Sequence, residues 1–329
     1  MSDVYTPPEV WTLDPENGGQ FAGINRPTAG PREERELPVG EHLFQLYSLG
    51  TPNGVKATIM FEELLEAGYS DAEYDAWRIE IFNGHQFWSG FVDINPNSKI
   101  PALLDRSGPE PFRVFESGAI LVHLAEKFDY LLPKANPARA EALSWLMWQM
   151  GSAPFIGGGF GHFYVYAPER YKYPIDRYAM ETKRLFDVAN NQLGRTEYLA
   201  GADYTIADIA AYTWLGNLYH GAYNGADRFL SLAEYENVGR WVKAIDARPG
   251  AIRGRLVNTK AMPERHSAAA SATSMPMRRK RSNTRSTATP WRRSASSTFS
   301  TDAWPTTNTW RARNTRSPTW RSGPGTAGW

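Results

Sequence analysis

Residues 97–105 read NSKIPALLD, and residues 115–120 follow as FESGAI. A proline immediately before a strand removes one backbone donor from the sheet. If the Ile100–Pro101 bond is cis, the turn presents the amide and carbonyl of Ile100 outward, where they can pair with an extended peptide as an added strand does. The first segment therefore predicts an edge at which a short peptide docks.

The second segment predicts a helix N-terminus near that edge. Ser117 would open the helix, with Glu116 just before it. Free amides at a helix N-terminus bind a carboxylate, and the carboxylate of Glu116 can pair with an ammonium group. In an arbitrary protein such a pair is more often a simple helix cap. With the first segment beside it, the pair indicates a site for a small peptide with an α-amino-acid end.

The sequence around these segments predicts a four-stranded sheet with helices over residues 38–132. A strand, a helix and a second strand imply a parallel pair with a crossover. A strand pair and a final helix follow, and the strand pair could be an antiparallel hairpin. The predicted strands are 41–48, 73–81, 95–105 and 112–117, and the predicted helices are 55–68 and 118–128.

From Ala138 to the tail, the pattern is helical throughout. In YTIAD, Thr205 can accept from the amide of Asp208 while Tyr204 packs on Ile209, which is a capping and staple pattern. The predicted helices are 138–150, 174–193, 205–221 and 232–248. We therefore expect an α+β protein, with a mixed domain at 38–132 and an all-α domain at 138–262.

The chain of 329 residues contains no cysteine. Structural disulfides, thiolate metal sites and an enzyme cysteine nucleophile are therefore excluded, and any thiol chemistry must use a thiol from outside. The histidines have no metal-ligand spacing, so we expect no metal. The N-terminus lacks the pattern of a secretory signal, and no apolar run is long enough for a membrane helix. We therefore expect a cytoplasmic protein.

The net charge of +1 hides an uneven distribution. Residues 263–329 carry twelve Lys and Arg but two acidic residues, which leaves 24 basic and 33 acidic residues in 1–262. An acidic body of this kind is a poor partner for nucleic acid. Residues 1–37, rich in Pro, Gly and Asn, predict an irregular arm.

The tail at 263–329 has three interpretations. Residues 268–329 contain no Leu, Ile, Val or Tyr, so we expect disorder. It can be a basic linker, or RRKR at 278–281 can belong to a nucleic-acid-binding arm. The third interpretation is a frameshift.

The frameshift hypothesis follows from reading each new codon with one base taken from the preceding codon. Residues 273–275 can then become HFY, and residues 314–320 can become EYTIADM. Both align with the in-frame text at one offset, which places Thr273 against His162 and Thr315 against Tyr204. The tail is then a frameshifted second copy of roughly residues 157–218. A coding DNA with incompatible third bases would contradict this.

In order along residues 1–262, the chain resembles a glutathione transferase, specifically the bacterial Nu-class enzymes described as disulfide-bond oxidoreductases. The resemblance implies a thioredoxin-like N-terminal domain, an all-α C-terminal domain and a homodimer. It is carried by FAGINRP (21–27), QLYSLGTPNG (45–54), FVDINPNSKIPAL (91–103), RVFESGAIL (113–121), GGGFGHFYVYAPE (157–169) and EYLAGADYTIAD (197–208).

The resemblance also implies how glutathione is bound. The backbone of Ile100, before a cis-Pro101, would bind the cysteinyl part of glutathione. Glu116 and Ser117 would hold the γ-glutamyl head. Further implied glutathione-binding residues are Gln86 and Lys99 along the peptide, and Arg177, which would reach from the helical domain toward a second glutathione.

The implied catalytic residues are Asn25, Thr51 and Asn53, which would surround the glutathione sulfur. A thiol with a pKa of about 8.5 is mostly protonated at neutral pH, and hydroxyl and amide donors aimed at the sulfur favour the thiolate. The thiolate then attacks a disulfide, and a second thiol resolves the mixed disulfide. A protein without cysteine can therefore catalyse this exchange by holding two glutathiones together.

We accordingly expect a glutathione-dependent disulfide reductase or transferase that acts on small disulfides or electrophiles, with organic hydroperoxide reduction as a further activity. Glutathione is the cosubstrate, and we expect no metal, nucleic acid or membrane partner. The alternative is a glutathione-binding regulatory or interaction protein without catalysis, because fold alone does not decide function.

Overall fold

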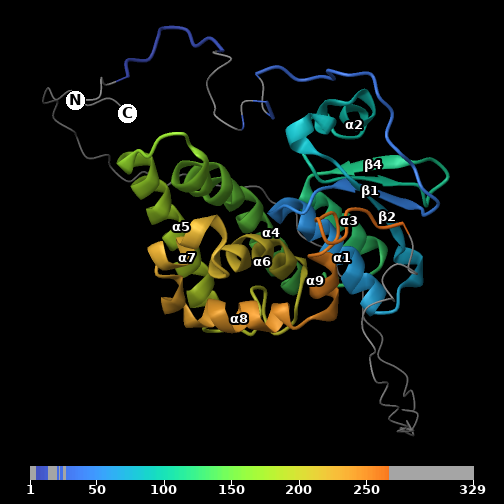
Figure 1. Cartoon of the computed structure of the whole chain (residues 1–329). Helices are drawn as coiled ribbons and strands as arrows, with labels where there is room; N and C mark the ends of the chain where they lie inside the picture. Colours follow the sequence, from blue (N-terminus) through green and yellow to red (C-terminus); the bar gives the residue numbers. More distant parts are fainter. Residues whose placement is uncertain (1–4, 14–20, 22, 25–26, 267–329) are drawn as a thin grey trace, which may run out of the picture. The chain divides into compact units, whose positions relative to one another are not determined.

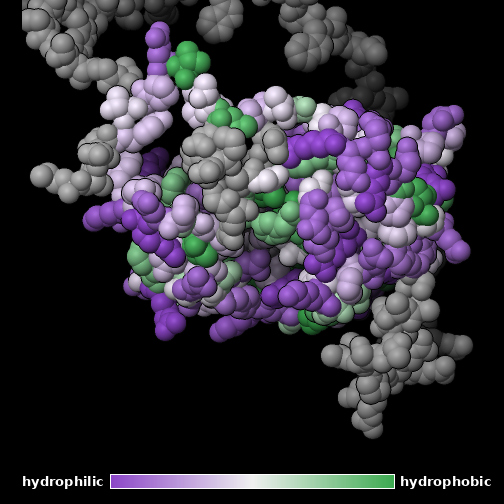
Figure 2. Space-filling view, turned by 45° about the horizontal axis from the view of Figure 1, so that its top comes forward, coloured by the Kyte–Doolittle hydropathy of each residue, from purple (hydrophilic) through white to green (hydrophobic). Residues whose placement is uncertain are grey.

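The structure is a computed structural model that describes residues 5–13, 21, 23–24 and 27–266. The predicted site residue Asn25 and residues 267–329 of the tail lie outside the described residues, so the frameshift hypothesis stays a prediction. Within the described ranges, every helix is too short or too polar to cross a membrane. The face in Figure 2 is mostly hydrophilic, with hydrophobic residues in separate patches.

The N-terminal domain contains the predicted four-stranded sheet. Its strands are β1 (Phe44–Ser48), β2 (Tyr74–Arg78), β3 (Ala102–Asp105) and β4 (Phe112–Phe115), in the order β2-β1-β3-β4. β1 runs parallel to β2 and antiparallel to β3, and β3 pairs antiparallel with β4. The predicted crossover and hairpin are both confirmed.

Helices cover both faces of this sheet (Figure 1). α1 (Pro52–Glu66) and α3 (Ser117–Lys127) lie on one face, and the short α2 (Ser89–Ile94), which the sequence analysis does not predict, lies on the other. Side chains of a strand alternate between faces. Phe44 and Leu46 of β1 accordingly join the large core with α1 and α3, while Tyr47 joins a smaller core with Phe91 of α2.

The C-terminal domain is all helical, so the predicted α+β class with a thioredoxin-like and an all-α domain is confirmed. The sequence analysis misses α7, α9 and the π-helical stretch. The elements are α4 (Ala138–Pro154), the π-helical stretch η5 (Phe155–Tyr166), α5 (Lys172–Leu193), α6 (Ile206–Tyr219), α7 (Ala222–Phe229), α8 (Glu236–Asp246) and α9 (Pro249–Gly254). α1 packs against α6 and α9, which joins the domains through one continuous core.

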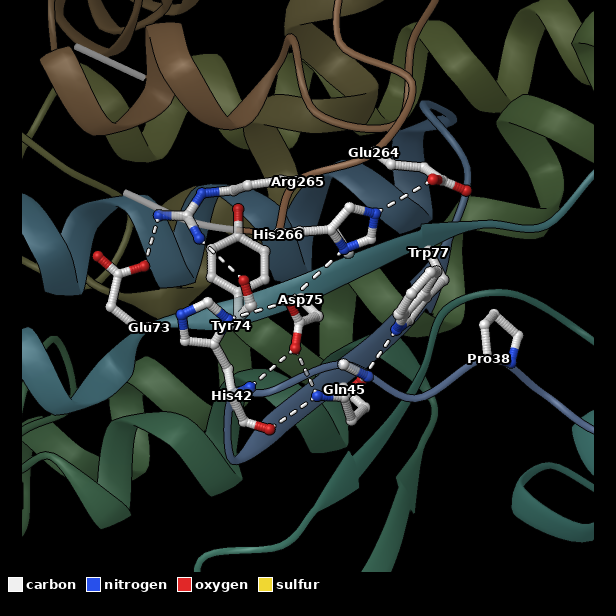
Figure 3. Close-up of polar contacts among 12 residues, drawn as sticks. Pro38, His42, Gln45, Glu73, Tyr74, Asp75, Trp77, Glu264, Arg265 and His266 are labelled. Atoms are coloured by element: carbon white, nitrogen blue, oxygen red, sulfur yellow. Dashed lines mark hydrogen bonds and ion pairs between the residues drawn. The ribbon is translucent and has the colours of Figure 1, made fainter. Parts of the chain in front are cut away.

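Residues 263–266 were assigned to the tail from the sequence, but Arg265 forms an antiparallel bridge with Ala76 at the outer edge of β2 (Figure 3). The amide of Ala76 donates to the carbonyl of Arg265 at 2.7 Å, and the amide of Arg265 donates back at 3.2 Å. The side chain of Arg265 is 3% exposed, and its guanidinium donates to the carboxylate of Glu73 at 2.9 Å. Its Nε lies 3.0 Å from the carboxylate of Glu62, which is an ion-pair contact without hydrogen-bond geometry. The fold therefore continues past the predicted domain end at residue 262 and includes Arg265.

Replacing Arg265 with Met should lower the stability of the protein by about 2–3 kcal/mol, because Glu73 loses its ion-pair partner and Glu62 keeps only Arg253. Thermal unfolding of the full-length chain measures this. Lys260→Met is the matched control, because Lys260 is exposed on the same segment. Equal melting temperatures for the two variants would contradict a role of Arg265 in fastening this segment.

Candidate functional site

A cavity of about 280 Å³ lies where the arm, the start of α1, the loop before β3 and the start of α3 meet. Eight of the ten residues predicted for the site are therefore placed at one cavity: Thr51, Asn53, Gln86, Lys99, Ile100, Pro101, Glu116 and Ser117. Its other lining residues, which the sequence analysis does not assign to the site, are Ile24, Ile81, Asn95, Asn97 and Ser98.

The Ile100–Pro101 bond is cis, as the resemblance implied. Within the described part of the chain, neither the amide nor the carbonyl of Ile100 has a hydrogen-bond partner. Asn95 shapes the turn before it: its Nδ2 donates to the carbonyl of Lys99 at 2.5 Å, and its Oδ1 accepts from the amide of Asn97 at 2.9 Å. Two backbone groups at the cavity wall are thus left for an extended peptide.

The N-terminus of α3 opens onto the same cavity. Ser117 is buried at the first position of α3. The backbone amides of the first turn of α3 have no hydrogen-bond partner inside the helix. Glu116 precedes the helix with φ 70°, a left-handed conformation, and its Oε1 accepts from Nδ2 of Asn97 at 3.5 Å. A carboxylate acceptor beside free amide donors matches the α-amino and α-carboxylate groups of one amino acid.

Two hydrogen-bond donors lie at the start of α1. Thr51 caps the helix, because its Oγ1 accepts from the amide of Gly54 at 3.4 Å. The hydroxyl hydrogen of Thr51 can therefore be donated into the cavity. The Oδ1 of Asn53 accepts from Nε1 of Trp214 at 2.9 Å and from Nζ of Lys56 at 3.0 Å. Because Oδ1 of Asn53 already accepts two hydrogen bonds, its side-chain amide NH₂ remains to donate to a ligand.

A close approach by η5 fixes the position of the Trp214 indole. A Cβ at Gly157 would lie 2.5 Å from the Trp214 ring, so a larger residue there would push the indole away. The first glycine of GGGFG thus helps orient Asn53 from the helical domain.

Lys56 is a residue of this region that the sequence analysis misses. It is fully buried beneath the cavity, and burial lowers the pKa of its ammonium to about 7. Its Nζ lies 2.7 Å from Oε1 of Gln149 and 3.4 Å from Oγ of Ser117. The sequence pattern carries no signal for it, because a lysine in the first turns of a helix is usually solvated.

Gln86 and Lys99 also line the cavity. Gln86 is 2% exposed, and its Oε1 has no partner among the described residues. A buried acceptor of this kind is costly unless a ligand or water satisfies it. Burial also lowers the pKa of Lys99. Their predicted contacts with a bound peptide stay predictions.

Arg177 is not brought to this cavity. It lies on α5 and lines a separate, shallower hollow with Tyr173, Asp176 and Met180. Its predicted contact with a second glutathione stays a prediction.

Tyr47 lies outside the cavity lining. It is buried and its hydroxyl donates to the carbonyl of Pro38 at 2.7 Å. Burial raises the pKa of Tyr47 strongly, which suits a packing role rather than catalysis.

The arm contacts the helical domain close to the cavity. The ring of Phe21 packs edge-on against Tyr166 of η5, with centroids 5.0 Å apart, and lies 5.9 Å from Phe82. This anchors Ile24 at the cavity wall, directly before Asn25 in the chain.

Among the described side chains, no group of three His, Asp or Glu residues could hold a metal ion.

Comparison with known families matches both halves of the chain. Residues 46–126 match the model for the glutathione S-transferase N-terminal domain, and residues 154–249 match that for the C-terminal domain. The chain is 56% identical over 259 residues to the disulfide-bond oxidoreductase YghU of Escherichia coli K12; the match covers 78% of this chain and 90% of YghU.

Solved structures agree with these matches. The glutathione transferase YghU of Streptococcus pneumoniae, complexed with glutathione, has a TM-score of 0.76 and 55% identity over 77% of this chain and 98% of its own. A glutathione transferase of Pseudomonas putida, with one glutathione disulfide bound per subunit, has a TM-score of 0.61 and 38% identity over 66% of this chain and 92% of its own.

Proposed function

Because this chain belongs to the glutathione transferase family, we propose that it binds glutathione in the described cavity and uses the glutathione thiolate to reduce disulfides. The observation that carries the proposal is the set of groups that line one cavity. Donors at Thr51 and Asn53, the unpaired backbone of Ile100 and the amino-acid clamp at Glu116 and Ser117 correspond to the successive parts of glutathione.

In this arrangement the backbone of Ile100 pairs with the cysteinyl part, and α3 holds the γ-glutamyl head. Thr51 and Asn53 donate to the sulfur and favour its ionised form. The thiolate attacks one sulfur of a disulfide, the S–S bond breaks, and the other sulfur leaves as a thiolate that takes up the proton released by glutathione. A second glutathione attacks the mixed disulfide, so that two glutathiones become glutathione disulfide and the substrate becomes two thiols.

The test is the reduction of a small dialkyl disulfide by the purified full-length chain with glutathione, coupled to glutathione reductase. We expect activity that saturates with both glutathione and the disulfide. In a protein without cysteine, such activity requires the thiol of glutathione. Glutathione binding by calorimetry without turnover would instead favour the non-catalytic alternative. A cytoplasmic location, a homodimer and hydroperoxide reduction belong to the same proposal.

Replacing Glu116 with Gln should weaken glutathione binding about tenfold, because the neutral amide loses a charge-assisted bond to the ligand ammonium. Calorimetry measures the affinity directly. Glu110→Gln serves as the control, because Glu110 is exposed in the turn before β4 and does not line the cavity. An unchanged affinity would place the γ-glutamyl head elsewhere.

A further inference from the structure

Lys56 occupies the point beneath the cavity where α1, α3 and α4 converge. Its ammonium lies 3.0 Å from Oδ1 of Asn53, 3.4 Å from Oγ of Ser117 and 2.7 Å from Oε1 of Gln149. An ammonium carries three N–H donors and no acceptor, so three oxygen acceptors match it. One buried side chain therefore touches the residue at the proposed sulfur end, the residue at the γ-glutamyl end and the helical domain.

In the described part of the chain, the direct contacts of Lys56 are with uncharged groups. Among the described residues no carboxylate forms an ion pair with it; its partners are two amides, a hydroxyl and the thioether of Met150 at 3.3 Å. The acidic group whose charge acts on it is Glu116, at the cavity wall. A buried cation without a counter-ion is costly. An anion bound in the cavity would offset that cost.

We propose that Lys56 is a positioning residue of the glutathione site: it fixes Asn53, Ser117 and Gln149 from beneath the cavity, and its charge favours the thiolate of bound glutathione. The inference rests on the proposed function and deepens it. Lys56 acts through Asn53, because holding Oδ1 directs the Asn53 amino group toward the ligand. It also acts through space, because a nearby positive charge favours an ionised thiol.

The lowered pKa of Lys56 agrees with this geometry. Burial lowers the pKa of the ammonium to about 7. Near neutral pH, a small change in the surroundings therefore alters the charge of Lys56. A thiolate in the cavity raises the pKa of Lys56 again, and the charged Lys56 in turn lowers the pKa of the thiol, since the coupling of two charges is reciprocal.

The experiment compares Lys56→Met and Lys56→Gln with the unmodified full-length chain. Methionine keeps the length of the side chain and removes its charge, while glutamine also keeps a polar end, so one of them can fold where the other does not. The measurement is the ultraviolet absorbance of the bound thiolate across pH, taken as the difference between the glutathione and S-methylglutathione complexes. We expect the pKa of the bound thiol to rise by about one unit or more in either variant.

The pH profile of disulfide reduction should shift to higher pH by the same amount. Lys243→Met is the matched control, because Lys243 is exposed on α8, does not line the cavity, and its loss removes an equal charge. A lower melting temperature with an unchanged thiol pKa would show a merely structural role and overturn the inference.

The two proposals fail separately. Binding and thiol ionisation are measured without turnover, so glutathione binding without disulfide reduction by the unmodified chain rejects the proposed function and leaves the thiol measurement readable. An unchanged thiol pKa in the Lys56 variants rejects the role of Lys56 and leaves the proposed function standing. An unmodified chain that binds no glutathione rejects both.

Discussion

Replacing Thr51 with Val and Asn53 with Leu in one variant should lower kcat for glutathione-dependent disulfide reduction by about 10²–10³-fold. Both changes keep the side-chain size and remove the donors placed at the proposed sulfur end of the cavity. Loss of a single donor to a developing or bound anion typically costs 10²-fold or more. Glutathione affinity should change little, because the contacts at Ile100 and α3 remain.

Thr51→Ser is the control for this variant. Thr51 also caps α1, and losing a cap costs about 1 kcal/mol of stability on its own. Serine retains the hydroxyl and the cap, so its turnover should stay close to that of the unmodified chain. If the double variant bound glutathione and kept full turnover, Thr51 and Asn53 would not activate the thiol.

Replacing Asp208 with Ala should lower the stability of the protein by about 3–5 kcal/mol, the largest loss that we expect from one substitution. The carboxylate of Asp208 is completely buried and accepts from the amides of Leu199 and Thr205, the hydroxyl of Thr205 and the indole of Trp241. Alanine leaves these donors buried without partners, and each such donor costs free energy.

Thermal unfolding at a fixed scan rate measures this loss, which corresponds to roughly 10 °C for a chain of this size. Asp203→Ala is the control, because Asp203 is exposed five positions earlier in the chain. The Asp208 variant should be recovered in poor yield. A melting temperature equal to that of the control would mean that α6 and α8 do not depend on this carboxylate.

Local patterns predicted a large part of the fold and, at Ile100, Glu116 and Ser117, one part of the site; the resemblance implied the other site residues. The capping box of Thr205 and Asp208 is present as predicted, because a cap involves residues three positions apart. The parallel pair with its crossover and the antiparallel hairpin also follow the prediction, and the cis bond before Pro101 is the one that the resemblance implied. The repeated asparagines of NPNSK could have indicated the turn that Asn95 shapes. The π-helical η5 was missed because its glycines and aromatics have no clear period.

The lack of cysteine, by itself, determined that any thiol chemistry here uses an external thiol, because composition does not depend on folding. The segments at Ile100 and Ser117 also predicted a peptide site from their local sequence alone. The tertiary structure decided what supports them. Lys56 and Gln149 meet although they are 93 residues apart, and Arg265 contacts Glu73 across 192 residues. Contacts between buried polar groups so far apart leave no periodic pattern in the sequence; they arise where packed helices and strands leave those groups no other partner.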